Sequence, residues 1–156
     1  KANLFLFKDI LSRRPHAVCL DIGANIGHHS LYMSIYSDEA HSFEPNPSVR
    51  KKIHEKIKIN AVENIYVHEV GLGLKDEELP FFEPEGVNKG TGSFIRDYSD
   101  NNSQNSECLM LKVANADNYI SQLSLDSLDL IKIDVEGFEK YVLEGLEKTL
   151  KTHAQL

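Results

Sequence analysis

The sequence predicts an α/β fold with a doubly wound, mainly parallel sheet, and three observations lead to this prediction. Residues 17–30 (AVCLDIGANIGHHS) have the pattern of a buried strand, a tight glycine turn and the start of a helix. Residues 47–60 form an amphipathic helix pattern, with Val49, Ile53 and Ile57 recurring every four residues. Strand-like and helix-like segments alternate along the chain, which is typical of a parallel sheet with right-handed crossovers.

Taken in order, the apolar patterns place each element. We expect helices at residues 3–12, 28–36, 47–60, 115–123 and 138–150, and strands at 18–21, 41–44, 65–70, 78–82, 92–96, 108–113 and 128–135. Residues 71–73 (GLG) are expected to turn the chain out of a strand, and residues 92–96 to pair with residues 78–82. The polar stretch 97–107 (DYSDNNSQNSE) has the composition of a long functional or mobile loop.

Length and composition indicate one domain, residues 1–156. The net charge of 17 − 24 = −7 argues against nucleic acid as the main partner, because phosphate binding depends on clustered Lys and Arg. No apolar run approaches the roughly 20 residues that span a bilayer. The two cysteines form no disulfide framework, and Cys19 is expected in the core. No signal peptide is visible, so we expect a cytoplasmic protein, and no metal-ligand spacing is found among the histidines and cysteines.

The turn between Gly23 and Gly27 is expected to bind a ligand through backbone N–H groups that point out of it. It departs from the dinucleotide pattern Gly-x-Gly-x-x-Gly, because Asn25 occupies the middle glycine position. Asp21 would repel a pyrophosphate and suits a cationic ligand, such as the amino group of S-adenosylmethionine (SAM). The alternative is an ordinary strand–helix turn with a capping Asp.

Two further acidic positions fall at the carboxyl ends of predicted strands, where open parallel sheets bind ligands. Glu44 lies 17 residues after Gly27 and could accept hydrogen bonds from both hydroxyls of a ribose. Asp134 and Glu136 could orient a ligand amine, bind an acceptor or remove its proton. The alternatives are surface or helix-capping carboxylates. His28 and His29 begin the first helix after the turn, where His29 could touch a ligand.

Three segments together resemble one family. Residues 21–30 (DIGANIGHHS), 43–47 (FEPNP) and 132–145 (KIDVEGFEKYVLEG) are similar to the FkbM-type SAM-dependent methyltransferases. The resemblance implies a class I methyltransferase, Rossmann-like fold. It also implies methyl transfer from SAM to a small-molecule or glycan-type acceptor, usually a hydroxyl on a sugar, lipid-linked or secondary-metabolite compound.

The same resemblance implies roles for individual residues. Glu44 would hold the ribose, and Asp134 and Glu136 would face the sulfonium and the acceptor, with Asp134 the first choice as catalytic base and Glu136 the second. Residues 91–93 (TGS) could line the acceptor cleft. The implied cofactor-binding set is Asp21, Gly23, Ala24, Asn25 and Gly27 around the methionine part, Glu44, Pro45 and Asn46 at the ribose and adenine, Val70 and Gly71 at the adenine edge, and Asp134.

One departure from the family affects the sheet. The family's sheet continues with strands beyond the last predicted helix, so we expect a domain truncated at its C-terminus, with an uncovered edge that favours a homodimer. Two other functions remain open on the sequence: a nucleotide-dependent Rossmann oxidoreductase, and a non-catalytic SAM-binding module.

Overall fold

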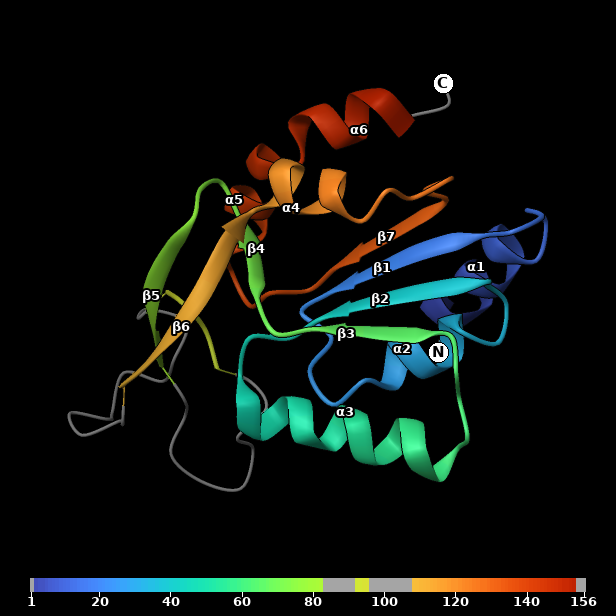
Figure 1. The fold of residues 1–156 in the computed structure, drawn as a ribbon, viewed down its shortest axis with the longest axis horizontal. Helices are drawn as coiled ribbons and strands as arrows, with labels where there is room; N and C mark the ends of the chain where they lie inside the picture. Colours follow the sequence, from blue (N-terminus) through green and yellow to red (C-terminus); the bar gives the residue numbers. More distant parts are fainter. Residues whose placement is uncertain (1, 83–91, 96–107, 154–156) are drawn as a thin grey trace.

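The computed structural model of the chain describes residues 2–82, 92–95 and 108–153 (Figure 1). The helices are α1 (Ala2–Leu11), α2 (His28–Met33), α3 (Pro47–Ile59), α4 (Ala116–Gln122), α5 (Glu139–Gly145) and α6 (Glu147–His153). The strands are β1 (Val18–Ile22), β2 (Glu39–Phe43), β3 (Ile65–His68), β4 (Gly71–Gly73), β5 (Glu77–Phe82), β6 (Cys108–Asn115) and β7 (Leu130–Ile133). No helix in these ranges is long and apolar enough to cross a membrane.

The main sheet is parallel throughout and has the strand order β3-β2-β1-β7. Its central strand β1 is buried along its whole length, as expected for a parallel strand covered on both faces. In the register, Leu20 lies between His41 of β2 and Ile131 of β7. The order reverses direction at β1, so the carboxyl ends of β1, β2 and β7 meet where such sheets bind ligands. The predicted doubly wound, mainly parallel sheet is confirmed.

A second sheet of order β4-β6-β5 stands beside the first (Figure 1). One sequence prediction is wrong here, and another holds only in part. Residues 71–73 form strand β4, parallel to β6, because the chain bends at Glu69 and Val70 and then joins this second sheet. Strand β5 pairs antiparallel with β6 along its length, whereas the expected partner segment contributes one bridge, between Phe82 and Ser93.

The helices divide between the two faces of the main sheet. Helices α1, α2 and α3 cover one face, while α4, α5 and α6 gather near the second sheet (Figure 1). The alternation along β1 matches this division: Cys19 packs in a core cluster with Phe7 and Met33, and Leu20 packs in another with Phe138 and Val142.

The last predicted helix is two short helices, α5 and α6, separated at Leu146. The absence of a side chain at Gly145 allows α5 to pack closely against β4. A Cβ at this position would collide with the backbone carbonyl of Gly73, so only glycine lets α5 lie this close to β4. The helix pair therefore fixes the segment after β7 against the second sheet.

Candidate cofactor and active site

A pocket of about 240 Å³ opens at the carboxyl ends of β1, β2 and β7. It brings together seven residues that the sequence singled out: Gly23, Ala24, Asn25, Glu44, Pro45, Asp134 and Glu136. His28, His29 and Lys132 also line it. The apolar side chains of the lining are those of Ile26, Val49, Phe81, Phe94 and Val135, among others. Three segments far apart in the sequence thus converge on one cavity.

The glycine turn has an unusual backbone that its residues permit. Asn25 adopts a φ of 50°, in the left-handed region that Asn tolerates better than most residues. It can therefore occupy a turn position that usually requires glycine. Gly23 has a φ of 76°, and a Cβ there would strike the carbonyl oxygen of Asp134. The turn is therefore pressed against the end of β7.

The expectation that the turn's N–H groups point toward a ligand is wrong for four of them, those of Gly23, Ala24, Asn25 and Gly27. The N–H groups of Gly23 and Ala24 both donate to the Phe43 carbonyl, at 3.1 and 3.0 Å. The Asn25 N–H donates to Glu44 Oε2 at 2.9 Å, and the Gly27 N–H to the Ala24 carbonyl at 2.8 Å. The turn is built from internal bonds, because β1 and β2 end side by side.

Glu44 is buried at the pocket wall and is 7% exposed. Its Oε2 accepts from the N–H of Asn25 and its Oε1 from the N–H of Asn46, both at 2.9 Å. Burial raises the pKa of Glu44 to about 7, against the lowering effect of these hydrogen bonds. A carboxylate has about four acceptor positions, so both oxygens keep capacity for ligand hydroxyls.

Asp21 and Lys132 form an ion pair behind the glycine turn. They are register partners on β1 and β7, and the Lys132 Nζ lies 3.0 Å from Asp21 Oδ1. The Ser30 hydroxyl donates to Asp21 Oδ2 at 2.6 Å. Lys132 donates its hydrogen bond to the Gly23 carbonyl at 3.0 Å, and Asp21 Oδ1 accepts none from the described residues. Asp21 is 1% exposed, so Lys132 supplies the charge that makes its burial tolerable.

Asp134 and Glu136 lie on the turn between β7 and α5. The side chain of Asp134 is 59% exposed, because it follows β7, an outer strand of the main sheet among the described residues. Glu136 is exposed and adopts a left-handed φ of 48°. Both carboxylates are accessible at the pocket, as an acceptor-facing role requires.

Two side chains hold this turn in roles that the sequence did not predict. Glu139 Oε1 accepts from the N–H groups of Val135, at 3.1 Å, and Gly137, at 3.3 Å. Ser93, which is 1% exposed, donates from its hydroxyl to the Glu136 carbonyl at 2.7 Å. Of the expected acceptor-cleft segment 91–93, Gly92 lines the pocket, Ser93 is a turn anchor and residue 91 lies outside the described residues.

Five predicted site residues do not line the pocket: Asp21, Gly27, Asn46, Val70 and Gly71. Asp21 lies behind the turn, Gly27 precedes α2, and the side chain of Asn46 caps α3 by accepting from Ser48 N. Val70 and Gly71 are buried at the junction of the two sheets. Their assignment to the adenine edge stays a prediction.

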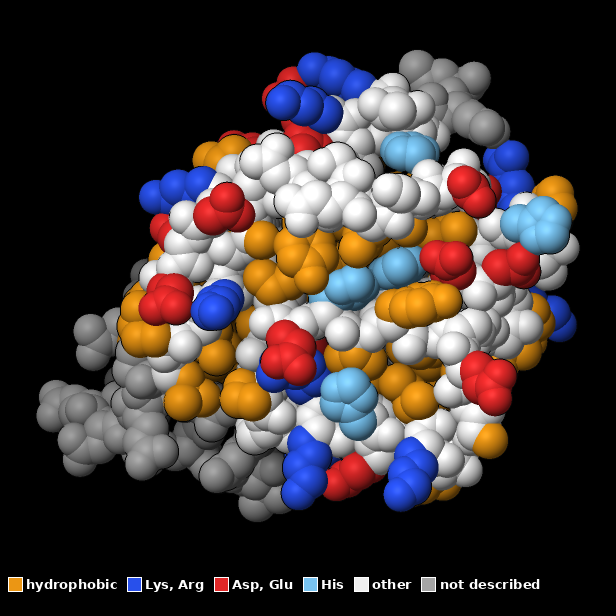
Figure 2. Space-filling model, in the orientation of Figure 1, with side chains coloured by type: hydrophobic (Ala, Val, Ile, Leu, Met, Phe, Trp, Pro, Cys, Tyr) orange, Lys and Arg blue, Asp and Glu red, His pale blue; other side chains and the backbone are white. Residues whose placement is uncertain are grey.

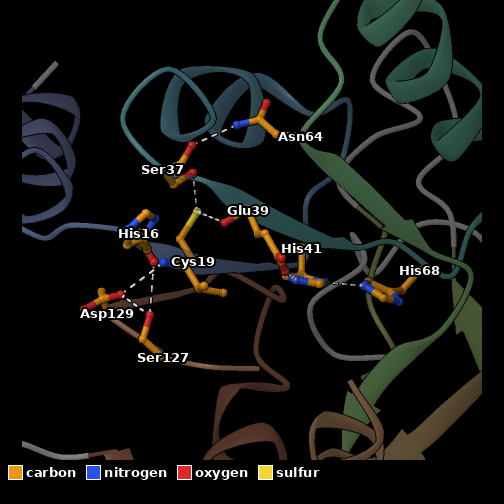
Figure 3. Close-up of polar contacts among 10 residues, drawn as sticks. His16, Cys19, Ser37, Glu39, His41, Asn64, His68, Ser127 and Asp129 are labelled. Atoms are coloured by element: carbon orange, nitrogen blue, oxygen red, sulfur yellow. Dashed lines mark hydrogen bonds and ion pairs between the residues drawn. The ribbon is translucent and has the colours of Figure 1, made fainter. Parts of the chain in front are cut away.

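A second polar cluster lies on the sheet itself, where histidine side chains sit among hydrophobic ones (Figure 2). His41 Nε2 is 3.1 Å from Glu39 Oε2, and His41 Nδ1 is 3.0 Å from His68 Nε2 (Figure 3). Tyr119 OH lies 3.3 Å from His68 Nδ1. The cluster could not be predicted from the sequence, because these residues are far apart along the chain and form no motif. Among the described residues no group of three or more His, Cys, Asp or Glu could hold a metal ion.

Cys19 belongs to the core, as its apolar neighbours predicted. It is fully buried and not disulfide-bonded, and its Sγ contacts the Ser37 hydroxyl (Figure 3). Burial raises the pKa of its thiol to about 12. The side chain therefore stays a neutral thiol.

Comparisons with known proteins identify the family. Residues 21–155 match the family model described as the methyltransferase FkbM domain. The chain is 29% identical to the AMB antimetabolite synthetase AmbE of Pseudomonas aeruginosa over 85% of its own length and 8% of the relative. It is 24% identical to the hexuronic acid methyltransferase AglP of Haloferax volcanii, over 86% of its own length and 52% of the relative.

A solved structure agrees with the fold. The methyltransferase FkbM of Methylobacillus flagellatus KT matches with a TM-score of 0.57 at 16% identity, over 90% of this chain and 32% of that one. The chain thus spans about half or less of the length of these proteins. The family match covers all three segments that the sequence singled out, and the chain belongs to the FkbM methyltransferase family.

Proposed function

We propose that residues 1–156 form a single SAM-binding domain of a methyltransferase that methylates a hydroxyl group. The observation that carries the proposal is the contact between the Asn25 N–H and Glu44 Oε2 at 2.9 Å. It joins the ends of β1 and β2 into one pocket wall, with a buried carboxylate that can accept from ribose hydroxyls.

The donor set of the pocket supports SAM as the cofactor. SAM carries an ammonium group and a sulfonium, and acidic side chains together with the Gly23 carbonyl suit both positive charges. Asp21 lies behind the turn with its Oδ1 held by the Lys132 ammonium at 3.0 Å, so it contributes negative charge close to the site. The apolar side chains of Val49 and Pro45 support a site for adenine beside Glu44.

The rival function, a nucleotide-dependent oxidoreductase, has less support. A pyrophosphate is bound by free N–H groups at such a turn. In this chain the N–H groups of Gly23, Ala24 and Asn25 already donate inside the protein. Glu44 in its ionised form would add repulsion.

The proposed transfer is a direct displacement. SAM supplies an electrophilic methyl group when it is bound. The acceptor oxygen forms the new bond to the methyl carbon as the sulfur–methyl bond breaks, and the acceptor's proton passes to a carboxylate. Asp134 is our first choice as that base and Glu136 the second, because both are exposed at the pocket. The protein's main contribution is to orient the two reactants.

We propose a sugar or similar polyol as the acceptor class. Hydroxyl groups of lipid-linked and secondary-metabolite compounds are the alternative acceptors. The relative AglP, named as a hexuronic acid methyltransferase, supports this class. The pocket lining combines the aromatic rings of Phe81 and Phe94 with the carboxylates of Asp134 and Glu136, which also suits a sugar ring and its hydroxyls.

We also propose that the chain forms a homodimer along β7. Among the described residues, β7 pairs with β1 along one edge only. An open strand edge offers backbone groups to a second strand. Sedimentation that finds only monomers over the working concentration range would remove this proposal.

The test of function is calorimetric titration with SAM, S-adenosylhomocysteine and NAD, followed by an acceptor screen. We expect the two adenosyl compounds to bind and NAD not to bind. Uronic acids and hexosides, incubated with SAM, would then be screened by release of S-adenosylhomocysteine. Binding of NAD alone would establish the oxidoreductase, and SAM binding without transfer to any compound would favour a non-catalytic SAM-binding module.

A further inference from the structure

Lys132 lies between two carboxylates, that of Asp21 behind the glycine turn and that of Asp134 at the pocket. Its Nζ is 3.0 Å from Asp21 Oδ1 and 3.7 Å from Asp134 Oδ2, and it donates to the Gly23 carbonyl at 3.0 Å. The side chain is 10% exposed, yet it lines the pocket. Its charge is therefore held at a defined point of the wall.

The ammonium keeps capacity for one more partner. It has three N–H groups. One donates to Gly23, a second faces Asp21, and Asp134 lies beyond hydrogen-bond distance. An oxygen of a ligand could accept from the third.

The charges of the wall match an amino acid. The acidic residues suit an ammonium group, but a carboxylate needs a cation or N–H donors. The N–H groups of Gly23, Ala24 and Asn25 are already used. Among the described lining residues, Lys132 is the one Lys or Arg, and His28 and His29 are the other side chains that could donate to a carboxylate.

We propose that Lys132 binds the α-carboxylate of the cofactor's amino-acid part and so determines selection for ligands that carry it. This inference rests on the proposed SAM site. If Lys132 served only to neutralise Asp21, its loss would lower the stability of the protein and the affinity for all ligands alike. If Lys132 binds the carboxylate, its loss must lower the affinity only for compounds that carry the amino acid.

The experiment uses S-adenosylhomocysteine, which carries the amino acid, and 5′-methylthioadenosine, which shares its adenosine and thioether but lacks it. Both are titrated by calorimetry into the wild-type chain and Lys132→Gln. A charge-assisted hydrogen bond predicts an affinity for S-adenosylhomocysteine lower by roughly 10- to 100-fold in Lys132→Gln. Affinity for 5′-methylthioadenosine should stay within about twofold. Lys132→Arg should restore most of the lost affinity, because it retains the charge.

Lys140→Gln, at an exposed lysine of α5, is the matched control and should change neither affinity. An equal loss for both ligands, or no loss for either, would overturn the inference. Failure of the wild-type chain to bind both would instead refute the proposed function.

A measurement on the wild-type chain covers the case in which Lys132→Gln does not fold. The decarboxylated analogue of S-adenosylhomocysteine keeps the ammonium and lacks the carboxylate. We expect it to bind at least about tenfold more weakly than S-adenosylhomocysteine. Equal binding of the two would contradict the role of Lys132.

Discussion

The backbone N–H of Asn25 donates to Glu44 Oε2, and this bond joins the glycine turn of β1 to the end of β2. It places a buried carboxyl with a pKa of about 7 in the wall of the pocket. Burial raises that pKa, so near neutral pH the empty site holds comparable amounts of the acid and the carboxylate.

Nucleoside binding should therefore depend on pH through Glu44. Ribose hydroxyls donate best to the ionised form, so affinity for 5′-methylthioadenosine should rise from pH 6 to pH 8 and level off above the pKa. Below the pKa, the affinity can change by at most about tenfold per pH unit, because one proton is involved. His28 and His29 line the same pocket, so the comparison with Glu44→Gln isolates the carboxyl. We expect Glu44→Gln to bind more weakly and without this pH dependence, as calorimetry at several pH values would measure.

Glu63→Gln, at an exposed glutamate before β3, is the matched control and should keep the wild-type pH profile. A Glu44→Gln variant that retained the pH dependence would assign it to another group.

Replacing the proposed base should separate chemistry from binding. Once an acceptor is known, Asp134→Asn should lower kcat by roughly 100-fold or more, in the range of a lost general base, while SAM affinity changes little. Glu136→Gln should have a smaller effect on kcat. Equal losses of turnover and SAM affinity in Asp134→Asn would make Asp134 a cofactor ligand.

The local spacing of apolar residues was sufficient to predict those helices and strands whose burial follows from nearby residues in the sequence. The apolar run before Gly23 and the spacing of Val49, Ile53 and Ile57 predicted β1 and α3, because burial on one or both faces determines these patterns. The start of α3 is local in the same sense, because the Asn46 side chain accepts from Ser48 N and Pro47 fits the first helical turn.

Features set by distant contacts could not be predicted in this way. The pairing of β5 with β6 joins segments separated by a long stretch of chain, and β4 is too short to show a period. The exposure of Asp134 depends on the outer position of β7 in the described sheet, and the residues of a strand do not determine its place in the sheet order. Lys132, Ser93 and Glu139 have roles defined only by the atoms that they contact.

The turn after β7 should depend on the Glu139 carboxylate. Although burial acts to raise its pKa, the hydrogen bonds from its own N–H and those of Val135 and Gly137 leave the pKa of Glu139 below its ordinary value. Glu139→Ala should cost about 1–3 kcal/mol in the free energy of unfolding, the range for bonds to a charged acceptor. Hydrogen exchange should accelerate at the amides of Val135 and Gly137.

Glu139→Gln retains an acceptor oxygen and should keep much of this protection. Glu144→Ala, on the solvent-facing side of the same helix, is the control that should leave exchange at the turn unchanged. Unaltered exchange in Glu139→Ala would show that Ser93 and the backbone suffice to hold Glu136.

The histidine cluster should make folding stability depend on acid pH. Burial, and next the neighbouring His41, lower the pKa of His68 to about 4, below the value of about 6.5 for an exposed histidine. The unfolded chain thus binds a proton at this position more readily than the folded one. The free energy of unfolding should fall as the pH is lowered from about 6.5 toward 4, by less than about 1.4 kcal/mol per unit, the limit for one proton.

Chemical denaturation at half-unit pH intervals would measure the effect, and His68→Gln should flatten the slope in this window. The groups that face His68 are His41, Tyr119 and, through His41, the Glu39 carboxylate. His54→Gln, at an exposed histidine of α3, should leave the slope as it is in the wild-type chain. If His68→Gln and the wild type lost stability in parallel, the acid sensitivity would belong to other groups, because only His68 is removed in that variant.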